Sequence, residues 1–215
     1  MDKRSIAAKL HRIEIAILGA LNSPEILEKL KAYGITIERI NNGKQLWDYV
    51  NHLMAIQVKE YGKQYAATDE QEKFLTLTYA QYMILVKVSR VAFKKQPNIL
   101  ASLGITGMRS RSLSGWLRRA RILYINLMEM PDALEMLVVY GYTVERLQKE
   151  LQDVEEVENL HIKQLSGKST AQQSTQKRDE AFDELCDWFS DFRAIARIAL
   201  YDDPQLLEAL GIVKK

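Results

Sequence analysis

The stretch Pro24–Arg39, PEILEKLKAYGITIER, returns 107 residues later as Pro131–Arg146, PDALEMLVVYGYTVER. The remaining two prolines, Pro97 and Pro204, are separated by the same interval. When the sequence is aligned with itself at this offset, without a gap, 27 positions are identical, against about six or seven expected by chance from average residue usage. The sequence therefore indicates an internal tandem duplication of a unit of roughly 107 residues.

This duplication predicts two homologous helical repeats, residues 1–107 and 108–215. They would pack either as two domains or as one body with pseudo-two-fold symmetry. A repeat of this length does not fit a solenoid, whose units have about 20–50 residues and occur in about three or more copies. Ten glycines and four prolines are few for 215 residues, which favours long helices over many short strands. We therefore expect an all-α fold with packing like that of a four-helix bundle.

Each repeat is predicted to contain three substantial helices and two short ones. Apolar residues at helical spacing mark the long helices, and a proline marks the first turn of each short one. In order, the predicted helices span residues 5–21, 24–34, 36–65, 69–95 and 97–104, and the matching residues 112–128, 131–141, 143–165, 177–201 and 204–211. Asn41, Asn42 and Gly43 are weak helix formers, so the third helix of the first repeat is expected to be continuous, with a kink there as an open alternative.

The quoted stretch also predicts a compact corner between two helices. Gly34 and Gly141 should end the second helix in each repeat, because glycine adopts the left-handed conformation of a C-cap without a steric penalty. The next residue, Ile35 or Tyr142, is expected to fold back onto that helix. Thr36 or Thr143 should then cap the following helix.

The two repeats differ most between their third and fourth predicted helices. Residues 166–176 read SGKSTAQQSTQ, with Ala171 as the only apolar residue. Such a composition is typical of a loop. We therefore predict a mobile loop here.

Composition indicates an ordinary globular protein, with 47% hydrophobic and 27% charged residues. The single cysteine, Cys186, excludes an intramolecular disulfide and favours a reducing compartment. No signal peptide is recognisable, so a cytoplasmic location is expected. The apolar segment Phe74–Phe93 is interpreted as a buried central helix rather than a membrane span, because the matching segment Ala181–Leu200 carries several charges. No membrane partner is expected.

The formal charge is distributed unevenly between the repeats. Residues 1–107 carry 15 basic and 10 acidic side chains (15 − 10 = +5), whereas residues 108–215 carry 15 and 18 (15 − 18 = −3). A dipolar chain of this kind can associate head to tail or steer a charged partner. A homo-oligomer is therefore among the expected states.

A basic cluster with a tryptophan is the sharpest local feature. Arginines beside an exposed aromatic ring are suited to phosphate or nucleic-acid contact. Two of these arginines have counterparts, Arg4 and Arg12, in a helix without such a cluster, so a solvated face paired with acidic groups explains the run equally well. A pI near 8.5 falls short of the usual nucleic-acid footprint, and nucleic acid is a possible but not a favoured partner. The candidate polyanion-binding residues are Arg109, Arg111, Trp116, Arg118, Arg119 and Arg121.

No constellation of reactive or metal-binding residues is predicted. The acidic residues between Glu180 and Asp191 share one helical face, which by default is solvated. Glu158 and His161 form the only Glu-x-x-His string, whereas a di-iron bundle requires two. The GKS sequence at Gly167 lacks the first glycine and the strand of a phosphate-binding loop. We therefore assign no catalytic residue, no metal ligand and no cofactor.

Arg90 and Arg197 lie at matching positions in mostly apolar surroundings. A buried or half-buried arginine needs an acceptor. We expect each guanidinium to bind acidic or carbonyl groups of the third-helix corner in its own repeat.

The repeated features all have a packing explanation. The favoured function is therefore a non-catalytic helical scaffold or protein-interaction module whose partner is a protein. Polyanion or nucleic-acid binding through the arginine cluster is the first alternative. A small-ligand binder or enzyme with a pocket between the halves is the second, because interfaces of this kind are common pocket locations.

Overall fold

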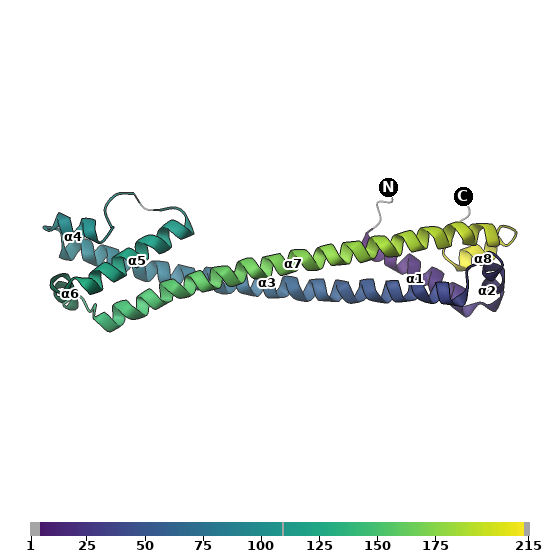
Figure 1. Cartoon of the computed structure of the whole chain (residues 1–215), viewed down its shortest axis with the longest axis horizontal. Coiled ribbons are helices and arrows are strands. Elements are labelled where there is room, and N and C mark those ends of the chain that lie inside the picture. Colours follow the sequence, from purple (N-terminus) through teal and green to yellow (C-terminus); the bar gives the residue numbers. More distant parts are fainter. Residues whose placement is uncertain (1–4, 109, 213–215) are drawn as a thin grey trace. The chain divides into compact units, whose positions relative to one another are not determined.

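The computed structural model describes residues 5–108 and 110–212 (Figure 1). These residues form eight helices and no strand, which confirms the all-α prediction. None of these helices has a stretch both long and apolar enough to cross a membrane. The helices are α1 (Ile6–Asn22), α2 (Pro24–Lys31), α3 (Ile37–Ala92), α4 (Pro97–Ser102), α5 (Leu113–Glu129), α6 (Pro131–Val138), α7 (Val144–Ala199) and α8 (Pro204–Ala209).

The helices of the two halves begin and end at positions 107 residues apart. α1 and α5 each have 17 residues, α2 and α6 have 8, α3 and α7 have 56, and α4 and α8 have 6. We retain the proposal that the chain arose by duplication, and we call residues 107 apart equivalent positions.

The predicted corner after α2 and α6 is confirmed. Gly34 and Gly141 both have φ = 80°. The Ile35 N–H donates to the Leu30 carbonyl at 3.1 Å, the bond that closes a Schellman motif. The Thr36 hydroxyl then accepts from the Arg39 N–H at 3.4 Å and caps α3.

The predicted loop at residues 166–176 is wrong, as is the break expected between residues 65 and 69. α3 and α7 are each continuous over 56 residues. Ala171 and Ser174 are buried, and the Ser174 and Thr175 hydroxyls donate to the Ala171 carbonyl at 2.7 and 3.1 Å. The small polar residues that resemble a loop therefore let α7 pack closely and satisfy their own hydroxyls within the helix.

The chain forms two compact units that cut across the two halves. Unit 1 contains the described residues up to Tyr61 and from Thr170 onwards, and unit 2 contains residues 62–169. Because α3 and α7 do not turn back at their middles, each contributes its first part to one unit and its second part to the other. The assignment of residues 1–107 and 108–215 as repeats stays a prediction about their origin.

In unit 1, α1, α2 and α8 gather around the first part of α3 and the last part of α7 (Figure 1). Ile13 and Ile17 of α1 share one core with Phe192 of α7. α1 approaches α8 closely at Gly19, where a side chain would lie 2.8 Å from the Ala209 carbonyl oxygen. The start of one half is thus covered by the end of the other.

Unit 2 has the reciprocal composition, with α4, α5 and α6 around the end of α3 and the start of α7 (Figure 1). Leu85 and Phe93 of α3 share a core with Leu123 of α5 and Leu147 of α7. The expectation of a buried helix over residues 74–93 holds for this face only, because the opposite face is exposed.

Gly43 is required by packing rather than being a site of helix weakness. A Cβ at this position would lie 2.1 Å from the Trp188 ring. The indole of Trp188 stacks on Phe192 at 5.3 Å and donates to the Arg39 carbonyl at 3.2 Å. The helix is continuous here, and the missing side chain makes room for the tryptophan.

The expected acceptor for Arg90 is wrong in its location. Its Nη2 donates at 2.8 Å to the carbonyl of Ile105, which follows α4, rather than to the third-helix corner. The carbonyl groups of the corner are bound by Arg39 and Arg146 instead. Arg39 donates to the Gly34 carbonyl at 3.2 Å, and Arg146 donates to the Gly141 carbonyl at 3.1 Å.

Candidate functional site

The structure brings two of the predicted site residues together in one cavity of unit 2. Arg111 and Trp116 both line it, whereas Arg118 is exposed on α5. The remaining described arginines have partners within the unit, since Arg119 donates to the Met108 carbonyl and Arg121 binds Glu158. Arg109 lies outside the described residues.

Trp116 is packed inside unit 2. Its side chain is 5% exposed, with the Tyr79 ring at 5.9 Å and the Tyr82 ring at 6.1 Å, the latter edge-on. Neighbouring rings therefore occupy much of the space beside the indole. The indole N–H is buried without a hydrogen-bond acceptor among the described residues.

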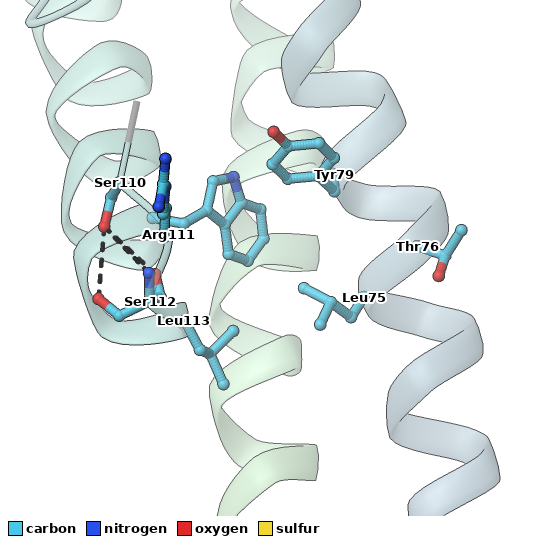
Figure 2. A pocket seen from close by; sticks show the side chains of 8 residues that line it. Leu75, Thr76, Tyr79, Ser110, Arg111, Ser112 and Leu113 are labelled. Atoms are coloured by element: carbon cyan, nitrogen blue, oxygen red, sulfur yellow. Dashed lines mark hydrogen bonds between the residues drawn. The ribbon is translucent and has the colours of Figure 1, made fainter. Parts of the chain in front are cut away.

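We call the cavity at the start of α5 the α5 cavity. It has a volume of about 550 Å³, which is within the range of small-molecule sites. Figure 2 shows residues of α3 on one side and the segment that leads into α5 on the other. Its lining residues are Leu75, Thr76, Tyr79, Ser110, Arg111, Ser112, Leu113 and Trp116.

Local hydrogen bonds position the segment that leads into α5. The Ser112 hydroxyl accepts from the Gly115 N–H at 3.2 Å and caps the helix. The Ser110 hydroxyl lies 3.3 Å from that of Ser112 (Figure 2). A side chain at Gly115 would meet the Ser110 hydroxyl at 2.0 Å, so glycine is needed for this turn. The Arg111 guanidinium has no hydrogen-bond or ion-pair partner among the described residues.

A second feature of unit 2 is an exposed apolar line on α3, which we call the α3 stripe. It consists of Leu77, Ile84 and Val91, each seven residues from the next, with exposed fractions of 65%, 52% and 57%. The equivalent residues of the first two are Glu184 and Asp191, which are also exposed. The equivalent of Val91 is Ile198, which is 55% exposed, so this helical face differs between the units at the first two positions, where carboxylates replace aliphatic side chains.

The stripe lies within a segment that contains no acidic residue. Between Glu72 and Glu129 the sequence has no aspartate or glutamate but ten basic residues: Lys73, Lys87, Arg90, Lys94, Lys95, Arg109, Arg111, Arg118, Arg119 and Arg121. Lys87 is exposed between Ile84 and Val91 and has no ion-pair partner among the described residues. The basic charge of this segment is therefore not balanced by acidic residues within it.

A buried polar group links α5 to the start of α7. The Tyr124 hydroxyl donates to Glu150 at 3.0 Å, and Arg146 Nε donates to the same carboxylate at 2.9 Å. The Arg146 guanidinium also lies 3.9 Å from the centre of the Tyr142 ring. Glu150 is 5% exposed, so a charge is held inside the unit by two donors. The equivalent of Glu150 is Gly43, and unit 1 has no such group at that position.

Burial raises the pKa of Tyr124 and Tyr142, and the Glu150 carboxylate raises the pKa of both further. At pH values above the usual tyrosine pKa, about 10, the unfolded chain loses these protons while the folded chain keeps them. Stability should therefore fall as pH rises above about 10, with a limiting slope of about 1.4 kcal/mol per pH unit for each tyrosine.

We expect Tyr124→Phe to reduce the magnitude of that slope by about 1.4 kcal/mol per pH unit, because the variant lacks the proton of one of the two tyrosines. The measurement is urea unfolding followed by circular dichroism from about pH 8 to pH 11. Tyr33→Phe, at an exposed position, is the control and should leave the slope unchanged. An identical slope in the wild type and Tyr124→Phe would contradict the assignment.

Sequence reasoning found the cation and the tryptophan of the cavity but missed its α3 wall and the stripe. The seven-residue spacing of Leu77, Ile84 and Val91, read against the carboxylates at equivalent positions, was the available signal for the stripe. The described residues contain no group of three or more potential metal ligands. Comparison with known proteins gives no match, since no family model fits the chain and no curated protein or solved structure is significantly similar to it.

Proposed function

We propose that the protein is a non-catalytic interaction module in which unit 2 binds an amphipathic helix of a partner protein along the α3 stripe. The observation that supports this is the exposure of Leu77, Ile84 and Val91 at positions whose equivalents include two carboxylates. Large exposed aliphatic side chains repeated along one helix face are typical of interaction sites. Unit 1 shows that charged residues are compatible with this helical face, because Glu184 and Asp191 occupy the positions equivalent to Leu77 and Ile84.

The spacing of the stripe specifies the shape of the partner. Apolar residues seven apart on one helix form half of a coiled-coil seam, and a second helix with apolar groups at matching intervals fills it. The partner is therefore expected to present a helix rather than an extended strand or a loop.

The charge around the stripe specifies the partner's flanks. The segment from Lys73 to Met128 carries only basic ionisable charges, so acidic residues beside the partner's apolar face would be attracted and basic ones repelled. Pairing of the α3 stripe with itself in a second copy would place Lys87 and its neighbours against other cations. An acidic amphipathic helix from another protein is thus favoured over self-association.

The test uses two synthetic helical peptides with leucine at the heptad seam positions, one flanked by glutamate and one flanked by lysine. The full chain should bind the acidic peptide at least about tenfold more tightly than the basic one. Leu77→Glu/Ile84→Asp, which installs the residues found at the equivalent positions, should weaken binding by a further factor of about ten to one hundred, because two apolar side chains lose their contact.

Val58→Glu is the matched control, because Val58 is 73% exposed on α3 outside the stripe. It should change the dissociation constant by less than about twofold. Equal binding of the acidic peptide to the wild type and to Leu77→Glu/Ile84→Asp would refute the proposal. Heparin binding unaffected by the stripe variant but abolished at Arg111 and Arg118 would instead support the polyanion alternative.

A further inference from the structure

We propose that the α5 cavity is a binding site for a small carboxylate with an aromatic or aliphatic body. This inference is independent of the docking of a helix on the α3 stripe. It rests on the combination, in one cavity, of an apolar wall and an arginine that has no partner among the described residues.

The body of the ligand is specified by the wall. Leu75 and Leu113 supply aliphatic surface, and Tyr79 and Trp116 supply aromatic surface. Sites for small organic molecules are mostly apolar with a few placed polar groups. A volume of about 550 Å³ accommodates a ring with a short chain.

The charged end of the ligand is specified by Arg111. Among the described residues that line the cavity its guanidinium is the only cation, and it has no hydrogen-bond or ion-pair partner among the described residues. A guanidinium binds a carboxylate through two parallel hydrogen bonds. One cation balances one carboxylate, whereas a phosphate ester would leave charge uncompensated, so a monoanion is favoured.

Two hydroxyls supply further polar groups at the cavity. The hydroxyls of Ser110 and Ser112 bind each other and the start of α5, and both line the cavity. A few placed polar groups of this kind fix the orientation of a small ligand. The Trp116 N–H is buried and has no acceptor among the described residues, and the proposal does not depend on it.

The wall of the cavity differs from the equivalent place in unit 1. Lys9, the equivalent of Trp116, lies with its Nζ 5.6 Å from the centre of the Phe182 ring, and Phe182 is the equivalent of Leu75. The aromatic and aliphatic wall residues Trp116 and Leu75 are therefore replaced in unit 1 by a lysine and a phenylalanine that contact each other.

The experiment is ligand-observed NMR titration of the full chain with 3-phenylpropionate, with 3-phenylpropionamide as the uncharged analogue. The amide should bind at least about tenfold more weakly, because it lacks the charge that pairs with Arg111. Arg111→Gln should weaken 3-phenylpropionate binding by a similar factor, and Trp116→Phe by about threefold, since the smaller ring removes part of the aromatic wall.

Arg118→Gln is the matched control, because it removes the same charge from an exposed position of α5 outside the cavity. It should change affinity by less than about twofold. The proposal is overturned if the acid and the amide bind equally, if Arg118→Gln weakens binding as much as Arg111→Gln, or if no saturable binding of the acid is seen. Leu77→Glu/Ile84→Asp should leave this titration unchanged, which separates the cavity from the stripe.

Discussion

Replacing Gly43 with alanine is expected to lower the free energy of unfolding by about 2 kcal/mol. The new methyl group would lie 2.1 Å from the Trp188 ring, and overpacking of this kind typically costs about 1–3 kcal/mol. The displaced indole also loses its stacking on Phe192 and its bond to the Arg39 carbonyl. Alanine is the better helix former by about 1 kcal/mol, so the steric cost has to outweigh a favourable intrinsic change.

The sign of this effect should reverse when Trp188 is removed. In a Trp188→Gln background, which installs the residue found at the equivalent Gln81, Gly43→Ala should stabilise the protein by up to about 1 kcal/mol, because only the gain in helix propensity remains. Urea unfolding of the four proteins in this cycle provides the measurement. If Gly43→Ala destabilised both backgrounds equally, the steric explanation would be wrong.

The second large effect is expected at Glu150. Glu150→Ala should lower the free energy of unfolding by about 3–4 kcal/mol, because removing one partner of a buried charged group leaves the others unsatisfied. Tyr124 is fully buried and would keep a hydroxyl without an acceptor, which accounts for most of the loss. Arg146 is 44% exposed and regains water, so its share is small.

Tyr142→Phe is the informative control for Glu150→Ala. The Tyr142 hydroxyl is buried and has no hydrogen-bond partner among the described residues, so its removal should leave stability within about 0.5 kcal/mol of the wild type or raise it. Chemical unfolding followed by circular dichroism measures both variants. A loss below about 1 kcal/mol for Glu150→Ala would show that the buried group contributes little.

Local features of the fold were accessible from the sequence because they depend on neighbouring residues. Ser5 caps α1, Pro24 opens α2 and Gly34 ends the corner with positive φ, each for a reason that is visible within a few residues. Apolar spacing likewise located the faces that form the cores. These inferences hold in both halves because the signals are repeated.

The way in which the helices combine could not be predicted from the sequence. It depends on whether residues 62–69 and 166–176 form a turn or continue the helix. A turn there would let each half close on itself, whereas a continuous helix carries the chain into the other unit. The residues around Gly167 and Ser174 are compatible with either state by composition. Packing of small side chains such as Ala171 against the neighbouring helix, which a propensity scale does not include, favours the helix.

Only part of the candidate site could be predicted from the sequence, for a similar reason. Arg111 and Trp116 stand close together in the sequence, whereas Leu75 and Tyr79 reach the same cavity from a distant segment. The orphaned N–H of Trp116 is a property of packing alone.

The division of the chain into units also sets the order in which the units can fold during synthesis. Unit 2 is one uninterrupted segment, so it can fold as soon as residue 169 has left the ribosome. Unit 1 also needs the residues from Thr170 onwards. Ile13 and Ile17 therefore cannot be buried in their core until Phe192 has been synthesised. At roughly 5–20 residues per second, the first helix stays uncovered for about ten to forty seconds, an interval in which a chaperone would find its apolar face available.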